Sequence, residues 1–305
     1  MSKFGVMVIG PAGAGKSTFC TALLTHLNLN RRSAFYVNLD PAAENFEHTP
    51  DLDIKELISV EDVMEDLHLG PNGGLVHCFE FLLENLDFLT EALDSLTEEY
   101  MIVFDMPGQI ELYSHMPLIP TLVRHLSRAG GLDIRLCATY LLESTFMTDR
   151  SKFFAGTMAA MSAMVALELP HINVFSKMDL VKGQVRRKDI RKFLDPSPDL
   201  LDEDPQEKQR RLEALRDGRE DPAQEEEYMD PNASSTVMRG ASFRKLNRKV
   251  ADVIENFGLV NFLELDVSKE DSVQAILSYI DDNVQWAEAQ EPREPHDEME
   301  VDDNV

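Results

Sequence analysis

Short apolar runs alternate along the chain with stretches that carry apolar residues at helical spacing. Six runs are apolar at nearly every position, as expected for strands buried on both faces of a parallel sheet. They are Phe4–Ile9, Ala34–Leu39, Tyr100–Phe104, Ile134–Leu142, Ile172–Phe175 and Phe262–Leu265. Helices are predicted at Ser17–Leu27, Leu75–Leu93, Leu118–Ser127, Ser151–Leu169, Ser242–Phe257 and Ser272–Glu288. The alternation predicts a three-layer α/β domain with a mostly parallel sheet.

Two acidic segments interrupt this pattern. Residues 195–231 contain five prolines and hold 14 acidic but only 5 basic side chains, which is typical of a flexible surface insert. We place that insert at 195–235 and predict that residues 291–305 form a disordered acidic tail. One domain is therefore expected over residues 1–290, with an unusually long connection at 41–99 between the second and third strands.

Net charge and cysteine count exclude several classes of function. The formal net charge is −26, whereas non-specific binding to nucleic acid or an anionic membrane needs a basic surface. The longest uncharged run, Phe153–Leu167, has 15 residues, fewer than the roughly 20 of a membrane span. Three cysteines without CxxC spacing predict neither a disulfide framework nor a zinc site, and they favour a reducing compartment such as the cytoplasm.

The clearest motif lies between the first strand and the first helix. Gly10, Pro11, Ala12, Gly13, Ala14, Gly15, Lys16 and Ser17 fit G-x-x-x-x-G-K-[ST], and Thr18 completes the predicted nucleotide-binding set. Glycines let the backbone wrap a triphosphate with its N–H groups pointing inward, and the following helix adds its positive dipole end. We expect Lys16 to neutralise β- and γ-phosphate oxygens and Ser17 to ligate Mg²⁺. The loop alone does not distinguish GTP from ATP, or a hydrolase from a kinase.

Acidic residues follow two of the other predicted strands. Asp40 and Asp105 each end an apolar run, where a carboxylate can reach the Mg²⁺ shell or, for Asp40, orient water. In the segment after Asp105, the Gly108 amide can face a γ-phosphate and Gln109 can position the attacking water. Glu111 is a candidate base. The plainer alternatives are a turn aspartate before Pro41 and a solvated helix start at Gln109 and Glu111.

A base-reading element is predicted after the fifth strand. Ser176, Lys177 and Asp179 resemble the guanine-reading pattern [N/T]-K-x-D, with serine at its first position. Asp179 would accept the two donors that guanine has and adenine lacks, so ATP should be rejected. The Lys177 stem would cover one face of the base, and a loop at 267–269 is a candidate to cover the other.

One further motif, Gly70-Pro71-Asn72-Gly73-Gly74, lies in the long connection. Taken alone, it predicts a turn. Taken in order with the phosphate loop, NLDPA, DMPGQIE and SKMD, it resembles the GPN-loop GTPases, over Lys3 to about Asp179 and more loosely to Asp282. That resemblance implies a P-loop domain with a helical insertion and a dimer whose nucleotide sites face each other. It also implies that Gly70, Pro71 and Asn72 reach the phosphates bound by the partner subunit, so that Asn72 acts in trans.

Finer details look most like a eukaryotic member of that family. The resemblance implies a heterodimer with the paralogous GPN-loop GTPase 1, or else a homodimer. It also implies a link to RNA polymerase II subunits, to polymerase assembly and to nuclear import, with the protein in the cytoplasm and shuttling to the nucleus. Neither nucleic acid nor membrane is an expected direct partner. The methionine-rich helix at Ser151–Leu169 is predicted to fill the core or to pack the dimer.

Three functions remain open from the residues. The first is a Mg²⁺-dependent GTP-hydrolysing switch. The second is a P-loop kinase of a small acceptor, with the basic cluster Arg186–Lys192 as its lid. The third is a non-catalytic nucleotide-binding scaffold.

Overall fold

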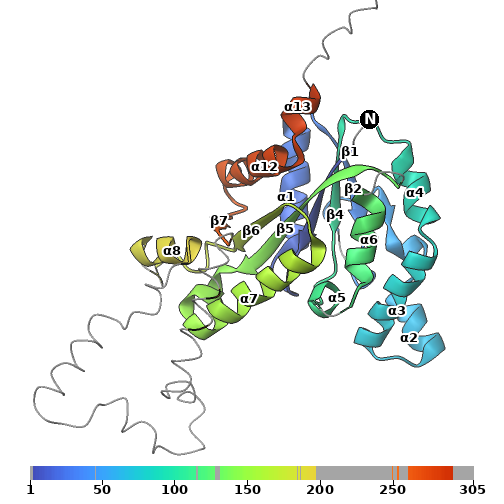
Figure 1. Cartoon of the computed structure of the whole chain (residues 1–305), viewed down its shortest axis with the longest axis horizontal. Coiled ribbons are helices and arrows are strands. Elements are labelled where there is room, and N and C mark those ends of the chain that lie inside the picture. The colour runs from blue at the N-terminus through green and yellow to red at the C-terminus, as the bar shows by residue number, and fades with distance from the viewer. Residues whose placement is uncertain are drawn as a thin grey trace, which may run out of the picture.

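The fold is built on one parallel sheet. The computed structural model describes residues 3–196 and 260–290 except 45, 115, 128–130, 184 and 186, together with positions 249 and 253. Within these residues seven strands form an all-parallel sheet in the order β3-β2-β4-β1-β5-β6-β7 (Figure 1). The strands are β1 Lys3–Ile9, β2 Ser33–Asn38, β3 Leu52–Asp53, β4 Tyr100–Asp105, β5 Ile134–Glu143, β6 His171–Ser176 and β7 Phe262–Glu264.

Helices cover both faces of the sheet, so the predicted three-layer α/β class is confirmed. They are α1 Lys16–Leu29, α2 Val60–Leu67, α3 Pro71–Glu84, α4 Asp87–Asp94, α5 Glu111–Ser114, α6 Leu118–Ser127, α7 Arg150–Leu167, α8 Arg187–Leu194, α12 Glu270–Val284 and α13 Trp286–Gln290, with 3₁₀ turns at Ile54–Glu56 and Ser144–Thr148. One apolar cluster packs α1 and α12 on one face, and a second packs α3, α4, α6 and α7 on the other. No helix among the described residues is long and apolar enough to cross a membrane.

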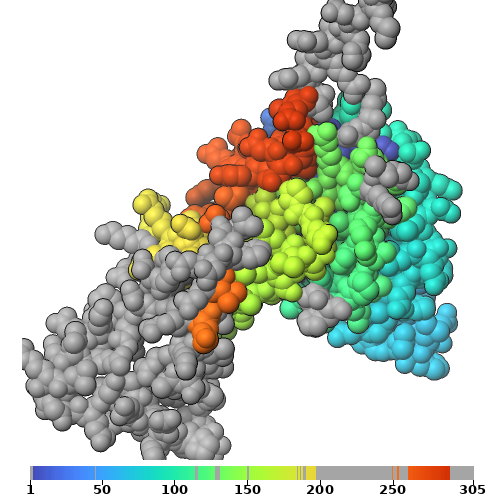
Figure 2. Space-filling view, viewed as in Figure 1, coloured from blue at the N-terminus to red at the C-terminus, as the bar shows by residue number. Residues whose placement is uncertain are grey.

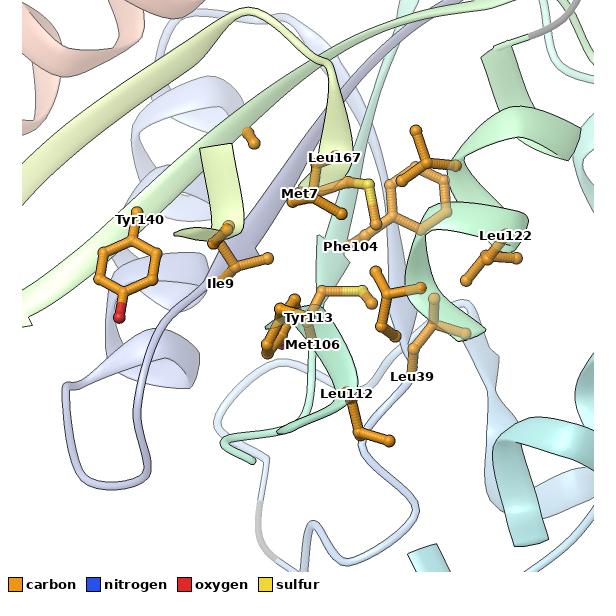
Figure 3. Packing of buried hydrophobic residues seen from close by; sticks show 14 of the residues in the cluster. Met7, Ile9, Leu39, Phe104, Met106, Leu112, Tyr113, Leu122, Tyr140 and Leu167 are labelled. Carbon is orange, nitrogen blue, oxygen red and sulfur yellow. The ribbon is translucent and has the colours of Figure 1, made fainter. Parts of the chain in front are cut away.

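Alternate residues of β1 feed these two clusters. Met7 and Ile9 join the cluster under α6 and α7, whereas Val6 and Val8 face α1 and α12, because side chains of a strand alternate between its faces. Figure 3 shows Met7 beside Phe104 within the first cluster. A strand buried on both faces is anchored from two sides, and it delivers the loop after Ile9 to a fixed place.

The six predicted strands are confirmed to within one residue at each end. The two-residue strand β3, which pairs with Val37 and Asn38, was not predicted because it is too short to show a period. The predicted helix Leu75–Leu93 is wrong as one helix: it divides at Asn85, whose side-chain amide donates to the Phe81 carbonyl. Likewise Ser272–Glu288 divides at Gln285, which has a left-handed φ of 59°.

The connection at 41–99 contains the short strand β3 and, after it, the helices α2, α3 and α4. The turn predicted for Gly70–Gly74 is wrong, because Gly70 is the extended N-cap of α3, Pro71 is its first residue, and Gly74 donates its amide to the Gly70 carbonyl at 2.8 Å. The preceding α2 was also missed, although Ser59 caps it through the Asp62 amide. Figure 2 shows α2 and α3 as a projecting corner of the molecule. On α7, Met161 lies in the core whereas Met158 is 39% exposed, so both roles considered for that helix stay open.

Some predicted segments fall outside the described residues. These are the acidic insert beyond residue 196, the helix Ser242–Phe257 apart from positions 249 and 253, and the tail at 291–305.

Candidate functional site

The phosphate loop runs from the carboxyl end of β1 to the start of α1. Gly10 has a φ of +139°, and a Cβ at this position would collide with the carbonyl oxygen of Leu141 on β5, so only glycine fits there. Pro11, Ala12, Gly13, Ala14 and Gly15 then turn the chain, and α1 begins at Lys16 with Ser17 and Thr18 exposed in its first turn. The glycine-rich turn thus leads directly into the N-terminus of α1, an arrangement that suits an anion such as a phosphate.

Lys16 lies within its own loop. Its Nζ donates to the Pro11 carbonyl at 3.3 Å, and the residue is only 7% exposed. Burial lowers the pKa of Lys16, while the nearby carboxylates Asp105 and Asp40 oppose that shift. The structure thus places the predicted ammonium and both predicted strand-end acids in one electrostatic neighbourhood.

Asp105 ends β4 and is 1% exposed. Burial raises the pKa of Asp105, and the Ser17 hydroxyl and the Lys16 ammonium oppose this rise. Its Oδ2 accepts a hydrogen bond from the Tyr36 hydroxyl at 3.2 Å, whereas its Oδ1 is buried and has no hydrogen-bond partner. Buried polar atoms are normally hydrogen-bonded, so a buried carboxylate oxygen without a partner needs an explanation, such as a bound ion.

These residues fit a magnesium ion bound together with a nucleotide. Among the described residues no cluster of three or more His, Cys, Asp or Glu side chains could hold a metal alone. Mg²⁺ in phosphate-transfer sites is usually held by one or two protein oxygens, waters and the phosphates themselves. The Ser17 hydroxyl and the free Oδ1 of Asp105 supply oxygens of that kind.

Asp40 follows β2 and lies in a tight turn. Its Oδ1 accepts the Ala42 amide at 3.0 Å, and its own amide donates to the side chain of buried Asn38 at 3.1 Å. The Asn38 side chain is held in turn by Asp53 at 2.8 Å. Asp40 is therefore a turn aspartate, as the plainer alternative predicts. The same turn places its carboxylate near Lys16 and Asp105.

The segment after Asp105 packs directly on the phosphate loop. A Cβ at Gly108 would lie 2.7 Å from the Cα of Ala12, so the two backbones touch. The next residue, Gln109, donates from Nε2 to Oδ1 of Asn72 at 3.1 Å. Asn72 is exposed in the first turn of α3, beside exposed Gly70 and Pro71. Two residues predicted to act on the γ-phosphate side thus meet within one chain.

Glu111, two positions after Gln109, lies at the start of a short helix. It is exposed at the first position of α5, as the solvated-helix-start reading expects. Its role as a base stays a prediction.

The base-reading turn is tied to the phosphate loop by its serine. Ser176 is buried at the end of β6, and its hydroxyl donates to the Ala14 carbonyl at 2.6 Å. The hydroxyl at the first position of the pattern therefore links the base-reading turn to the phosphate loop. Lys177 follows with a left-handed φ of 55°, and its Cε would lie 3.8 Å from a Cβ on Gly15. Asp179 is exposed two residues later, so the turn presents a carboxylate to solvent beside the loop.

Sequence reasoning missed several residues that hold this turn. Glu143 forms an ion pair with Lys177, with Oε2 and Nζ 3.3 Å apart, and the Ser144 hydroxyl donates to the Lys177 carbonyl at 2.7 Å. Lys182 donates to Asp266 after β7 at 2.6 Å, which brings the predicted covering loop at 267–269 beside the turn. Only the position of Glu143 at a strand's carboxyl end could have signalled its part in the site.

Comparisons with known proteins agree with this arrangement. A family model described as a conserved hypothetical ATP binding protein matches residues 8–286. A protein named GPN-loop GTPase 3 from Gibberella zeae is 64% identical over 303 residues, with 99% of both chains covered. A protein of the same name from Aspergillus fumigatus is 59% identical, with 99% of this chain and 98% of that protein covered. Another from Saccharomyces cerevisiae is 48% identical, with 99% of this chain and 100% of that protein covered.

A solved structure gives independent support for the fold. An apo-form GTPase from Pyrococcus abyssi superposes with a TM-score of 0.64 over 92% of this chain and 97% of its own, at 17% sequence identity. The family model and the full-length relatives together show that the chain belongs to the GPN-loop GTPase family.

Proposed function

We propose that this protein binds GTP with Mg²⁺ and hydrolyses the terminal phosphate as a molecular switch. One observation carries the proposal: the carboxyl ends of β1, β4 and β6 bring Lys16, Asp105 and the Ser176–Asp179 turn onto a single loop. The names of the relatives are consistent with it.

Each residue has a chemical task in this proposal. The loop amides and Lys16 bind the phosphates, and Ser17 with Asp105 would hold Mg²⁺, which neutralises phosphate charge when bound. Gly108 touches Ala12, so its segment is placed to respond when the terminal phosphate leaves. Gln109 orients the attacking water, with its side chain held by Asn72. Asp179 accepts the guanine donors, and Lys177 covers the base.

The base is the point that most needs a direct measurement, because the family model's description speaks of ATP. We expect calorimetry with magnesium to show GTP bound at least about 100-fold more tightly than ATP, since ATP leaves Asp179 unpaired. In Asp179→Ala the preference should largely disappear. Equal affinity of the wild-type protein for both nucleotides would refute the proposed base reading.

Product analysis separates hydrolysis from phosphoryl transfer. Release of inorganic phosphate from GTP without any added acceptor supports the switch. Transfer of the γ-phosphoryl group to an added small acceptor, with GDP formed and no inorganic phosphate released, would instead support a kinase, whose lid would include the exposed Arg187, Arg191 and Lys192 of α8.

The cellular role is proposed on the motif resemblance. The protein would work as a dimer with the paralogous GPN-loop GTPase 1 or with itself. It would serve RNA polymerase II assembly and nuclear import from the cytoplasm. Mass spectrometry of proteins that co-purify from cells tests this role: recovery of the paralogue and of polymerase subunits is expected. A preparation that contains neither would contradict it.

A further inference from the structure

Tyr36 is a buried tyrosine that none of the nucleotide-binding motifs contains. It lies on β2 and is 4% exposed, and its hydroxyl donates to Oδ2 of Asp105 at 3.2 Å. Its ring packs edge-on against Phe46, with the ring centroids 6.3 Å apart. The backbone amide of Tyr36 donates to Asp51 at 2.8 Å. The residue is therefore fixed by its ring, its backbone and its hydroxyl.

The sheet register makes this contact specific. On adjacent parallel strands, Tyr36 pairs with Val103 and Asn38 pairs with Asp105. Residues two apart on a strand lie on the same face, so Tyr36 and Asp105 point to the same side of the sheet, where α1 packs. The Tyr36 side chain therefore reaches along the sheet to the carboxylate of Asp105, which lies two residues beyond its own register partner, Val103.

The two carboxylate oxygens of Asp105 therefore differ in their hydrogen bonding. Oδ2 is held by Tyr36, whereas Oδ1 is buried and has no partner at hydrogen-bond distance, although the Ser17 hydroxyl is near enough to oppose the rise in the pKa of the carboxyl group. A carboxylate with one oxygen bonded cannot turn freely, so the other oxygen keeps one direction. Residues that orient a metal-binding carboxylate by a hydrogen bond contribute to metal affinity without touching the metal.

We propose that Tyr36 is a positioning residue for magnesium, holding Asp105 so that Oδ1 faces the ion's coordination shell. This inference rests on the proposed function. A purely structural tyrosine would instead only satisfy a buried carboxylate, and its loss would change stability without changing magnesium affinity.

The test is Tyr36→Phe, which keeps the ring and removes the hydroxyl. GDP affinity is measured by calorimetry at a series of magnesium concentrations and in excess chelator. We expect the magnesium concentration at half-effect to rise about tenfold, as for other residues that orient metal ligands, with chelator-state GDP affinity unchanged. Tyr140→Phe is the matched control, because Tyr140 is a buried tyrosine of β5 whose pKa is raised by burial alone, with no carboxylate beside it.

A double-mutant cycle with Asp105→Asn tests whether Tyr36 affects magnesium affinity through the Asp105 carboxylate or through a general disturbance of the fold. If Tyr36 acts through the carboxylate, Tyr36→Phe adds no further loss of magnesium affinity in the Asp105→Asn protein. An unchanged magnesium midpoint in Tyr36→Phe, or an equal rise in Tyr140→Phe, would overturn the inference and leave the proposed function standing. A wild-type protein whose nucleotide binding ignores magnesium would overturn both.

Discussion

At the scale of single residues, the contact between Asn72 and Gln109 joins two motifs that lie 37 positions apart. Side chains that hold each other act as a unit, so their removal is not additive. We expect Gln109→Ala and Asn72→Ala each to slow single-turnover GTP hydrolysis by about 10²–10³-fold, the usual cost of losing one positioned polar group. The double variant should be no slower than the slower single variant.

Nucleotide binding provides the control for this pair. Neither side chain belongs to the phosphate loop, so the affinity for GDP should stay within about threefold of wild type in all three variants. Equal hydrolysis rates in wild type and Gln109→Ala would favour the non-catalytic scaffold. Multiplicative losses in the double variant would show that the two residues act separately.

Gly108 is a second residue whose surroundings allow a sharp prediction. A methyl group at this position would lie 2.7 Å from the Ala12 backbone, and overpacking of this kind costs about 1–3 kcal/mol. Gly108→Ala should therefore weaken binding of a non-hydrolysable GTP analogue by roughly five- to 150-fold, measured by calorimetry. Gly73→Ala is the control, because its methyl would meet only the Leu69 side chain, at 3.6 Å, and should leave affinity near wild type.

Motif spacing could predict which residues enter the site but not which side chains hold them. Lys16, Asp105 and Ser176 were found because each follows an apolar run at a fixed offset. Tyr36 and Asn38 were not, since they lie inside a run and reach the site only through the pairing of β2 with β4. Pairing between strands far apart in sequence leaves no local signal.

At the scale of elements, strands were more predictable than helices. A strand buried on both faces is apolar at nearly every position, as β1 and β4 are. The helix α8 was missed because the described residues that it exposes, Arg187, Arg191 and Lys192, are all basic. Its apolar contact is Phe193, whose ring centroid lies 4.9 Å from that of Phe153. The split between α3 and α4 depends on Asn85 bonding back to Phe81, a contact that apolar periodicity does not show.

The loops after β6 and β7 are tied by the ion pair of Lys182 with Asp266. The hydrogen bond from Lys182, reinforced by Ser268, lowers the pKa of Asp266 to about 2. A carboxyl group whose pKa is lower in the folded state stabilises the fold above its unfolded pKa of about 3.9. That contribution is lost as the pH falls through about 2.

Lys182→Met should expose this dependence in urea unfolding measured from pH 6 to pH 2. The variant is expected to be less stable at pH 6 by about 1 kcal/mol or less, because the lysine is 56% exposed and its pair is screened. The difference should shrink toward pH 2, where Asp266 becomes protonated in both proteins. A constant difference across the range would show that the loss is one of packing, not of charge.

At the scale of the whole molecule, the open question is which chain supplies Asn72 during hydrolysis. Within one chain Asn72 already reaches Gln109, while the family resemblance implies that it acts on the partner's nucleotide. The projecting corner of α2 and α3 (Figure 2) leaves Asn72 exposed, so the residue is accessible to a second subunit. Both arrangements satisfy the same geometry, and subunit mixing distinguishes them.

The experiment mixes Asn72→Ala with Lys16→Ala, each expected to release phosphate at least about 100-fold more slowly than wild type by itself. If Asn72 acts in trans in a homodimer, a mixed dimer carries one site with an intact phosphate loop and an intact partner Asn72. Random pairing of a symmetric dimer then restores about a quarter of wild-type phosphate release per chain. If Asn72 acts only through its own Gln109, the mixture stays as slow as its components. Every chain in the mixture lacks either Lys16 or Asn72. No chain can therefore hydrolyse GTP with its own side chains alone, and recovery requires an Asn72 from the partner.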